Sequence, residues 1–325
     1  MAETISPGRW RGLKTTSTPG HVFTILAFDQ RGSFTEMLPK GTSYDTAVQI
    51  KCEVVSALSA HASAVLLDPT YGLRPAMEMA GACGLLLALE KSGYSGDSTY
   101  RRIAFDEDWT VGKIKRMGAS AVKLLAYYHP ESGALAEEIE AAIRDLCATC
   151  HRYDLPIFVE PISYSLDRNL PKNSAVFART RPAVVRETAR RLSALGVDVL
   201  KLEFPADAAF DQDEASWQAG CEAISAVCRV PWVLLSAGVD FETFERQARV
   251  ACRAGASGFL AGRAIWKEIA PLTPAERARF IVETATPRLK RLIEIAAGAA
   301  RPWTDFYAPV AAGDDWFRSY GALSA

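Results

Sequence analysis

A lysine inside a short apolar run is the residue whose type and position point most directly to chemistry. Lys201 lies in the run Val197–Phe204, which Gly196 and Pro205 bound at a length typical of a strand. Side chains alternate along a strand, so Lys201 and Glu203 share one face. A buried ammonium tends to lose its proton or to gain a partner, and a neutral lysine can form an imine with a carbonyl substrate. Alternatively, Lys201 lies at the strand end and extends its amine to water.

A second lysine, Lys123, lies within the apolar run Ala121–Tyr128. If both lysines face one lumen, each disfavours protonation of the other, and one of them should have a lowered pKa. We take Lys201 as the nucleophile and Lys123 as the second cation, although the spacing is equally compatible with the reverse roles.

Two carboxylates end apolar runs and could move protons. Glu160 precedes Pro161 and is our candidate acid/base, since imine chemistry needs a proton shuttle. The alternative is a solvated carboxylate before a proline turn. Asp29 could orient Lys201 or act as a second relay; alternatively it caps a helix or pairs with Arg31.

These residues require a fold that brings strand ends together. The chain contains apolar runs at 22–29, 64–68, 85–89, 121–128, 156–160, 197–204, 232–235 and 258–260. Helical patterns occupy most of the gaps, at 45–58, 109–117, 135–151, 182–195, 214–227, 241–253 and 274–299. Pro182 suits a first helical turn, and Gly196 a helix cap. Strands that alternate with helices predict parallel βαβ units, and eight of them predict an α/β fold of the (β/α)₈ TIM barrel type. A doubly wound sheet is the competitor, but no Gly-x-Gly-x-x-Gly follows the first strand.

Active sites of such barrels lie at the carboxyl ends of the strands. Ser236 and Gly238 follow the seventh strand, and Gly262 and Arg263 follow the eighth. Loops at these positions frequently bind phosphate through backbone N–H groups, and Arg263 adds a cation. The alternative is that the glycines serve tight turns only. Two further polar residues, Gln30 and Arg31, follow the first strand, and we expect them to contribute to substrate binding.

The bulk composition excludes several functions. The 325 residues carry a net charge of −1, which gives no electrostatic reason to bind nucleic acid or an anionic membrane. No apolar run is long enough to span a bilayer, and residues 1–21 are polar, so we expect a cytoplasmic protein whose N-terminal leader packs on the barrel. Its barrel would extend over residues 22–299, followed by an aromatic tail over 300–325. That tail could pack on the barrel or on a second subunit, and we expect a homo-oligomer.

Neither the cysteines nor the histidines predict a cofactor. The seven cysteines are dispersed and mostly apolar in context, so reduced thiols are expected. The segment Cys147-Ala148-Thr149-Cys150-His151 matches the spacing for haem attachment, but it continues a helical pattern and no export signal accompanies it. None of the four histidines pairs with another at metal-ligand spacing. We therefore expect no metal and no cofactor. The loop 92–99, which carries Gly93 and Gly96, could be a lid or an ordinary polar loop.

Six stretches at the strand ends resemble the class I, metal-independent tagatose-1,6-bisphosphate aldolases, and the resemblance extends over about residues 22–290. They are Ala27-Phe28-Asp29-Gln30-Arg31-Gly32; Leu66-Leu67-Asp68-Pro69 with Tyr71-Gly72-Leu73; Gly84-Leu85-Leu86-Leu87-Ala88 with Glu90-Lys91 and Gly93-Tyr94; Val199-Leu200-Lys201; Leu235-Ser236-Ala237-Gly238-Val239; and Gly262-Arg263-Ala264. Glu160-Pro161, the sequence from Trp232 onward and residues 255–264 are also similar to the sulfofructose-1-phosphate aldolases.

The resemblance implies a (β/α)₈ barrel and a class I aldolase without a metal. It implies Lys201 as the Schiff-base lysine, Glu160 as the acid/base, and Lys123 and Asp29 as their site partners. The residues that it implies for the substrate's 1-phosphate are Ser236, Gly238, Gly262 and Arg263.

The expected reaction is cleavage of a ketohexose phosphate, first of all tagatose 1,6-bisphosphate, to dihydroxyacetone phosphate and glyceraldehyde 3-phosphate. The alternative substrate is 6-deoxy-6-sulfofructose 1-phosphate, which would give sulfolactaldehyde. Two other readings stay open: a sugar-phosphate-sensing regulatory protein, and a barrel isomerase that works without an imine.

Overall fold

The computed structural model describes residues 2–91, 97–311, 313–318 and 320. Eight parallel strands form a closed barrel in the order of the chain, β2-β3-β4-β5-β6-β7-β8-β9, with β9 paired to β2. The strands are β2 (Phe23–Phe28), β3 (Ala64–Leu67), β4 (Gly84–Ala88), β5 (Ala121–Tyr127), β6 (Ile157–Ile162), β7 (Val199–Leu202), β8 (Trp232–Leu235) and β9 (Gly258–Ala261). The predicted TIM barrel is confirmed.

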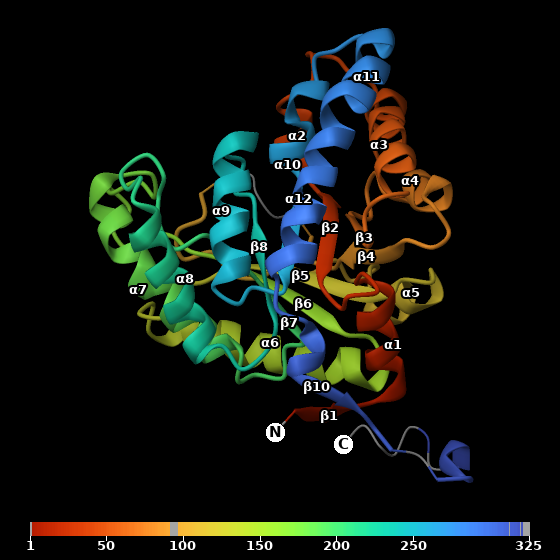
Figure 1. The fold of residues 1–325 in the computed structure, drawn as a ribbon, viewed down its shortest axis with the longest axis vertical. Coiled ribbons are helices and arrows are strands. Elements are labelled where there is room, and N and C mark those ends of the chain that lie inside the picture. The colour runs from red at the N-terminus through yellow and green to blue at the C-terminus, as the bar shows by residue number, and fades with distance from the viewer. Residues whose placement is uncertain (1, 92–96, 312, 319, 321–325) are drawn as a thin grey trace.

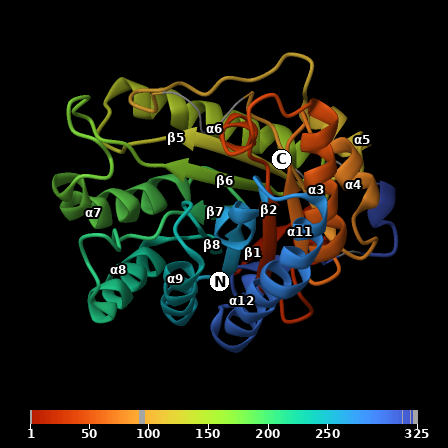
Figure 2. The same ribbon diagram turned by 90° about the horizontal axis from the view of Figure 1, so that it is seen from above.

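The helices lie around the outside of the barrel, as the view from above shows (Figure 2). The longer ones are α3 (Tyr44–Leu58), α6 (Ala134–Arg152), α7 (Ala175–Leu192), α8 (Glu214–Val227), α9 (Phe241–Arg253) and α12 (Thr286–Ala299). The shorter ones are α2 (Gly32–Thr35), α4 (Leu73–Glu78), α5 (Val111–Arg116), α10 (Arg263–Trp266) and α11 (Pro274–Phe280). Every residue of the eight barrel strands is buried, because helices cover one face of the sheet and the lumen lies on the other.

Helix α9 shows how the sequence sets these boundaries. Asp240 caps its N-terminus, and its side chain accepts a hydrogen bond of 2.8 Å from the backbone N–H of Thr243. Phe241, Phe244 and Ala248 recur at helical spacing and are buried against the barrel. Capped amphipathic helices alternate with buried strands along the chain, and this pattern allowed the barrel to be predicted from the sequence.

The N-terminal segment 3–15 and residues 303–309 pack at the end of the barrel opposite the carboxyl ends of the strands (Figure 1). Strand β1 (Glu3–Ile5) pairs with β10 (Tyr307–Pro309), and α1 (Pro7–Thr15) follows β1. Gly12 of α1 lies so close to Pro156 that a Cβ there would meet the proline ring at 2.5 Å. The leader is therefore in contact with the start of β6.

The predicted boundaries of α7 were wrong. The helix begins at Ala175, where Ser174 accepts a hydrogen bond from the N–H of Phe177. Pro182 therefore lies inside the helix rather than in its first turn. Because proline has no backbone N–H, it makes no hydrogen bond to the carbonyl of the preceding turn. The helix ends at Leu192, and Gly196, with φ of 88°, forms the turn into β7 instead of the cap.

Three other boundaries differ from the prediction. The helix expected at 109–117 spans only Val111–Arg116. Strand β6 continues to Ile162, so Glu160 lies within the strand and not at its end. The single helix expected at 274–299 is divided by a π-helical turn over Ile281–Ala285. Pro287 in the first turn of α12 lacks an N–H, which interrupts the regular hydrogen-bond ladder there.

The aromatic tail divides into a buried and an exposed part. Trp303 and Tyr307 are buried, and Trp303 makes an edge contact with Trp10 at 4.6 Å between ring centroids. Phe317, by contrast, is 60% exposed. A homo-oligomer stays a prediction. In the described part of the chain, no helix has the length and apolarity needed to cross a membrane. Most of the loop proposed as a lid, residues 92–96, lies outside the described residues.

Candidate active site

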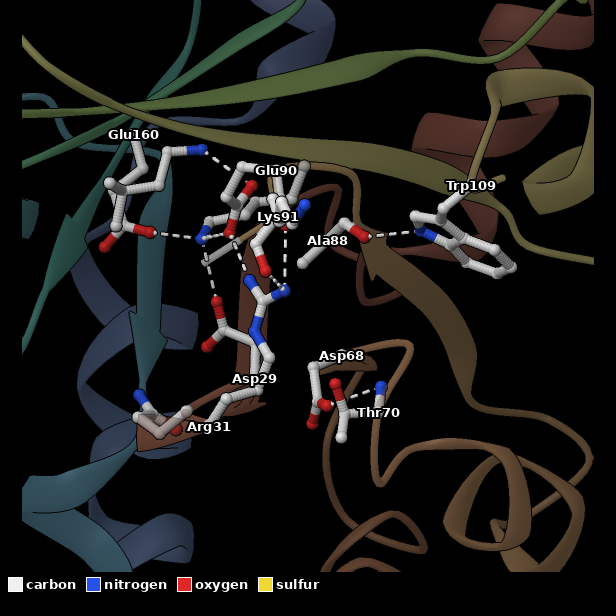
Figure 3. Close-up of polar contacts among 12 residues, drawn as sticks. Asp29, Arg31, Asp68, Thr70, Ala88, Glu90, Lys91, Trp109 and Glu160 are labelled. Carbon is white, nitrogen blue, oxygen red and sulfur yellow. Dashed lines mark hydrogen bonds and ion pairs between the residues drawn. The ribbon is translucent and has the colours of Figure 1, made fainter. Parts of the chain in front are cut away.

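Lys123 on β5 is the most heavily paired cation in the lumen. Its Nζ atom lies 2.8 Å from Asp29, 3.0 Å from Glu90 and 2.9 Å from Glu160, and its side chain is fully buried. Burial alone would lower the pKa of Lys123, but the three carboxylates more than offset this and raise its pKa above the usual value. Lys123 is thus held as an ammonium. Figure 3 shows Asp29, Glu90 and Glu160 gathered from separate strands.

Lys201 on β7 faces the same carboxylate from the other side. Its Nζ atom lies 2.8 Å from Oε1 of Glu160, whereas Lys123 contacts Oε2. Glu160 is the one carboxylate that pairs with Lys201 among the described residues. Lys201 also lines a cavity of about 390 Å³ at the mouth of the barrel. The lysine with one carboxylate partner and access to a cavity is better suited to attack a substrate than the lysine with three.

Glu160 and Asp29 are held as carboxylates by these amines. Burial would raise the pKa of Glu160, but the charges of Lys123 and Lys201 outweigh it and lower that pKa below its usual value. The pKa of Asp29 is lowered in the same way, against its own burial. Oδ1 of Asp29 is buried without a hydrogen-bond partner. Both groups can therefore accept a proton, and Glu160 is in direct contact with the candidate nucleophile.

Arg31 is oriented toward Glu90 and not toward the cavity of Lys201. Its guanidinium donates to the backbone carbonyls of Glu90 and Lys91, at 2.8 and 2.7 Å, and pairs with the Glu90 carboxylate at 3.2 Å. Figure 3 shows this contact. Glu90 in turn accepts from the N–H of Leu125 at 3.0 Å. Our sequence reasoning placed Glu90 directly after the third strand, at the mouth of the barrel, but assigned it no role in the site.

Most of the residues predicted to hold a phosphate line the same cavity as Lys201. Ser236, Gly262, Arg263 and Gln30 all line it. Ser236 Oγ accepts a hydrogen bond of 3.4 Å from the N–H of Gly262. Gly238, with φ of 81°, lies against Arg263 so closely that a Cβ would meet the guanidinium carbon at 3.2 Å. Oε1 of Gln30 is buried without a hydrogen-bond partner. The set offers a cation, a hydroxyl and an amide to an anionic group.

The haem-like motif has a structural role in this fold. Cys147 and Cys150 are free thiols buried on α6, and burial raises the pKa of both. His151 contacts the buried carboxylate of Asp198 at 3.0 Å. Among the described residues, no group of three or more histidine, cysteine or acidic side chains could hold a metal ion.

Comparison with known proteins identifies the family. The family model described as "DeoC/LacD family aldolase" matches residues 23–268. The chain belongs to the DeoC/LacD aldolase family. A relative from Streptococcus pyogenes serotype M3 (strain SSI-1), named tagatose 1,6-diphosphate aldolase 1, is 33% identical over 93% of this chain and 99% of that protein. Another from Staphylococcus aureus (strain JH9), named tagatose 1,6-diphosphate aldolase, is 35% identical over 75% of this chain and 80% of that protein.

A solved structure gives the same fold at lower identity. It is described as that of a Schiff-base-forming fructose-1,6-bisphosphate aldolase, and it aligns with a TM-score of 0.60 at 20% identity, covering 88% of this chain and 98% of that one. Family membership makes this protein an aldolase, a lyase that acts on a carbon–carbon bond, and favours the enzyme over the sensing protein and the isomerase.

Proposed function

We propose that this protein is a class I aldolase that cleaves a ketohexose phosphate, first of all tagatose 1,6-bisphosphate, through a Schiff base on Lys201. The observation that carries the proposal is the contact of 2.8 Å between Lys201 Nζ and Glu160 Oε1, two residues that line the cavity. The products would be dihydroxyacetone phosphate and glyceraldehyde 3-phosphate. The names of the relatives from Streptococcus and Staphylococcus support this choice of sugar.

The imine would form with Glu160 as the proton carrier. Lys201 gives a proton to Glu160 and attacks the C2 carbonyl of the ketose, and the adduct rearranges to a neutral carbinolamine. Glu160 then returns the proton to the carbinolamine hydroxyl, which leaves as water, and an iminium on Lys201 remains. The carboxylate is regenerated in this step, so it is ready for the next one.

Cleavage would use the same carboxylate again. Glu160 accepts the proton of the C4 hydroxyl, the C3–C4 bond breaks, and its electron pair moves into the iminium to give an enamine and a free aldehyde. Glu160 then protonates C3 of the enamine, and water hydrolyses the resulting iminium to release dihydroxyacetone phosphate and free Lys201. Throughout, the ammonium of Lys123 lies 2.9 Å from Oε2 and stabilises the carboxylate form.

Arg263, Ser236, Gly238, Gly262 and Gln30 would hold the 1-phosphate. Ser236, Gly262, Arg263 and Gln30 line the same cavity as Lys201, which supports this role, because the 1-phosphate is carried on the carbon next to the carbonyl carbon that the lysine attacks. A guanidinium binds two phosphate oxygens at once and so fixes the orientation of the substrate. Arg31, which faces Glu90, would act by positioning that carboxylate against Lys123.

The test is a coupled assay of dihydroxyacetone phosphate release from tagatose 1,6-bisphosphate. Glu160→Gln keeps the shape of the side chain but cannot accept a proton, and should lower kcat by about 10²–10⁴-fold. Glu222→Gln, at an exposed position of α8, is the matched control and should leave kcat unchanged. Full activity of the Glu160 variant would contradict the proposed acid/base role, and absence of cleavage by the unmodified protein would contradict the choice of sugar.

A further inference from the structure

A lysine lies on the buried face of helix α3, where the helical pattern calls for an apolar residue. Lys51 is spaced with Ala47, Val54 and Leu58 along that face, and its side chain is fully buried. It does not line the cavity of Lys201. A buried ammonium needs partners, because its loss of water is otherwise uncompensated. The partners of Lys51 therefore indicate what the residue does.

Lys51 donates three hydrogen bonds, and two of them go to the main chain around Asp29. Its Nζ atom lies 2.8 Å from the carbonyl oxygen of Phe28 and 2.8 Å from that of Gln30. The third bond goes to the carboxylate of Asp68, which directly follows β3. An ammonium has three N–H groups, so these contacts use all of them. Lys51 thus holds the backbone on both sides of Asp29.

Asp68 is itself fixed to the loop that follows β3. Its Oδ1 atom accepts hydrogen bonds from the backbone N–H groups of Thr70 and Tyr71, at 2.8 and 2.9 Å. Figure 3 shows the contact with Thr70. Its other carboxylate oxygen faces Lys51. The ion pair therefore connects three elements, namely α3, the loop after β3 and the segment 28–30.

The surroundings of this ion pair are apolar. The rings of Phe28, Phe34 and Tyr71 lie around the ammonium of Lys51, with their centroids at 4.8, 5.4 and 5.3 Å. Burial lowers the pKa of Lys51, and the charge of Asp68 opposes this only in part. Packed apolar residues often stabilise such a position as well as a buried ion pair does, or better. The contacts with the main chain beside Asp29 therefore point to a role in the reaction rather than in stability.

The residue between the two anchored carbonyls belongs to the site of Lys201. Asp29 is 3% exposed, and its Oδ2 atom lies 2.8 Å from Lys123 Nζ. The same Nζ atom lies 2.9 Å from Oε2 of Glu160. A displacement of Asp29 would therefore be transmitted to Lys123, and from Lys123 to the carboxylate that carries protons.

We propose that Lys51, held by Asp68, is a positioning residue for the aldol reaction. It fixes the backbone on both sides of Asp29 and so keeps that carboxylate against Lys123. The inference rests on the proposed function, in which the ammonium of Lys123 keeps Glu160 ionised. Lys51 contacts neither the substrate nor the reacting atoms, and its effect on catalysis passes through Asp29.

The experiment is a double-mutant cycle on kcat for cleavage of tagatose 1,6-bisphosphate, with Lys51→Met and Asp29→Asn. Lys51→Met keeps an unbranched side chain and removes all three donors. It should lower kcat by about 10–100-fold, because a misplacement of about 1 Å can cost about 10²-fold in rate. In the Asp29→Asn protein, the same substitution should lower kcat by about twofold at most, because the group that Lys51 positions is already altered there.

Arg9→Met is the matched control, because it removes the cation of another buried ion pair. Arg9 pairs with Asp198 at 2.7 Å, at the opposite end of the barrel. This variant should lose stability, as Lys51→Met does, and should leave kcat unchanged. A purely structural role of Lys51 predicts a different pattern, in which Lys51→Met lowers kcat by the same factor whether residue 29 is aspartate or asparagine. That equal factor would overturn the proposal, as would an unchanged kcat in Lys51→Met.

Asp68→Asn tests the same proposal if Lys51→Met does not fold. Its amide oxygen can still accept from Thr70 and Tyr71, but its NH₂ group then faces the ammonium of Lys51 in place of a carboxylate oxygen. The variant should lower kcat in the presence of Asp29 and have little effect in the Asp29→Asn protein. An equal effect in the two proteins would overturn the proposal.

Failure of this inference is distinguishable from failure of the proposed function. If the unmodified protein forms no borohydride-trapped adduct on Lys201, the Schiff-base assignment itself fails. If the adduct forms and the effect of Lys51→Met does not depend on Asp29, the positioning role fails while the Schiff-base assignment stands.

Discussion

The Nζ atom of Lys201 lies 2.8 Å from Oε1 of Glu160, and both side chains are almost completely buried. The other oxygen of the same carboxylate contacts Lys123, so a single acid group lies between two amines. Three carboxylates surround Lys123 and keep it charged, while Lys201 opens onto the cavity. This asymmetry is the physical basis for assigning the nucleophile to Lys201 and the fixed charge to Lys123.

The charge of Lys123 should set the acid limit of activity. Its ammonium lowers the pKa of Glu160, so Lys123→Met should raise that pKa and leave the base protonated up to a higher pH. The acid limb of the kcat/KM profile should then move to higher pH by about one unit or more, as expected for removal of an opposite charge in contact. The measurement is the pH dependence of aldol cleavage between pH 4 and 9.

Lys123→Arg is the control for this prediction, because it retains the positive charge. Its acid limb should stay close to that of the unmodified protein even where kcat falls. An acid limb that does not move in Lys123→Met would show that Glu160 does not depend on this cation.

Gly238 should act through Arg263. A Cβ at position 238 would lie 3.2 Å from the guanidinium carbon, so Gly238→Ala should displace Arg263 and raise KM for a ketose 1-phosphate by about 3–10-fold, part of the energy of a charged hydrogen bond. Gly41→Ala is the matched control: it has a nearly equal φ of 83°, but a Cβ there meets nothing within 4 Å. Both variants should lose about 1–2 kcal/mol of stability through the left-handed backbone.

Thermal unfolding of the two variants measures the backbone strain that both share. Steady-state kinetics measures the effect of the contact with Arg263, which only Gly238→Ala makes. The account predicts similar losses of melting temperature and a raised KM in Gly238→Ala alone. An equal KM in both would mean that Arg263 does not hold the phosphate.

Asp198 should tie the N-terminal helix to the barrel in a pH-dependent way. Its buried carboxylate contacts Arg9 at 2.7 Å and His151 at 3.0 Å, and the hydroxyl of Tyr307 donates to its backbone carbonyl at 2.8 Å. Burial would raise the pKa of Asp198, but its hydrogen bond from His151 and the charge of Arg9 lower it. The folded-state pKa is below the unfolded value of about 3.9, so the stabilisation is present above that pH and is lost as the pH falls through the folded-state pKa.

Asp198→Asn should therefore lower the free energy of unfolding by about 3–5 kcal/mol at pH 7, because it leaves Arg9 without its buried partner. The difference from the unmodified protein should shrink below pH 4. Chemical denaturation at several pH values is the measurement, with Glu78→Gln in the exposed pair with Arg74 as a control whose midpoint should not change. A constant difference across the pH range would contradict the linkage.

Much of this arrangement follows from the sequence because strand alternation and strand ends are local signals. Lys123, Glu160 and Lys201 each interrupt an apolar run, and once eight runs are taken as a barrel they must converge on one mouth. The grouping of Ser236 and Arg263 follows from the same rule. The convergence of strand ends predicts which residues lie close together, but it does not predict which of their atoms are in contact.

Other features depend on tertiary contacts that no local pattern carries. Asp68 also ends a strand, yet it is fully buried against Lys51 and does not line the cavity of Lys201. Arg31 follows a strand as well, but its guanidinium donates hydrogen bonds to the carbonyls of Glu90 and Lys91 and does not line the cavity of Lys201. Pro182 favoured a helix start by its chemistry, whereas Ser174 caps the helix earlier. Each of these outcomes depends on a partner that is distant in sequence or on a competing cap.

The central claim is tested most directly by trapping the imine. The protein is incubated with dihydroxyacetone phosphate, reduced with borohydride, digested, and the modified peptide is located by mass spectrometry. The account predicts a covalent adduct on Lys201 and none in Lys201→Met. An adduct on Lys123, or no adduct in the unmodified protein, would contradict it.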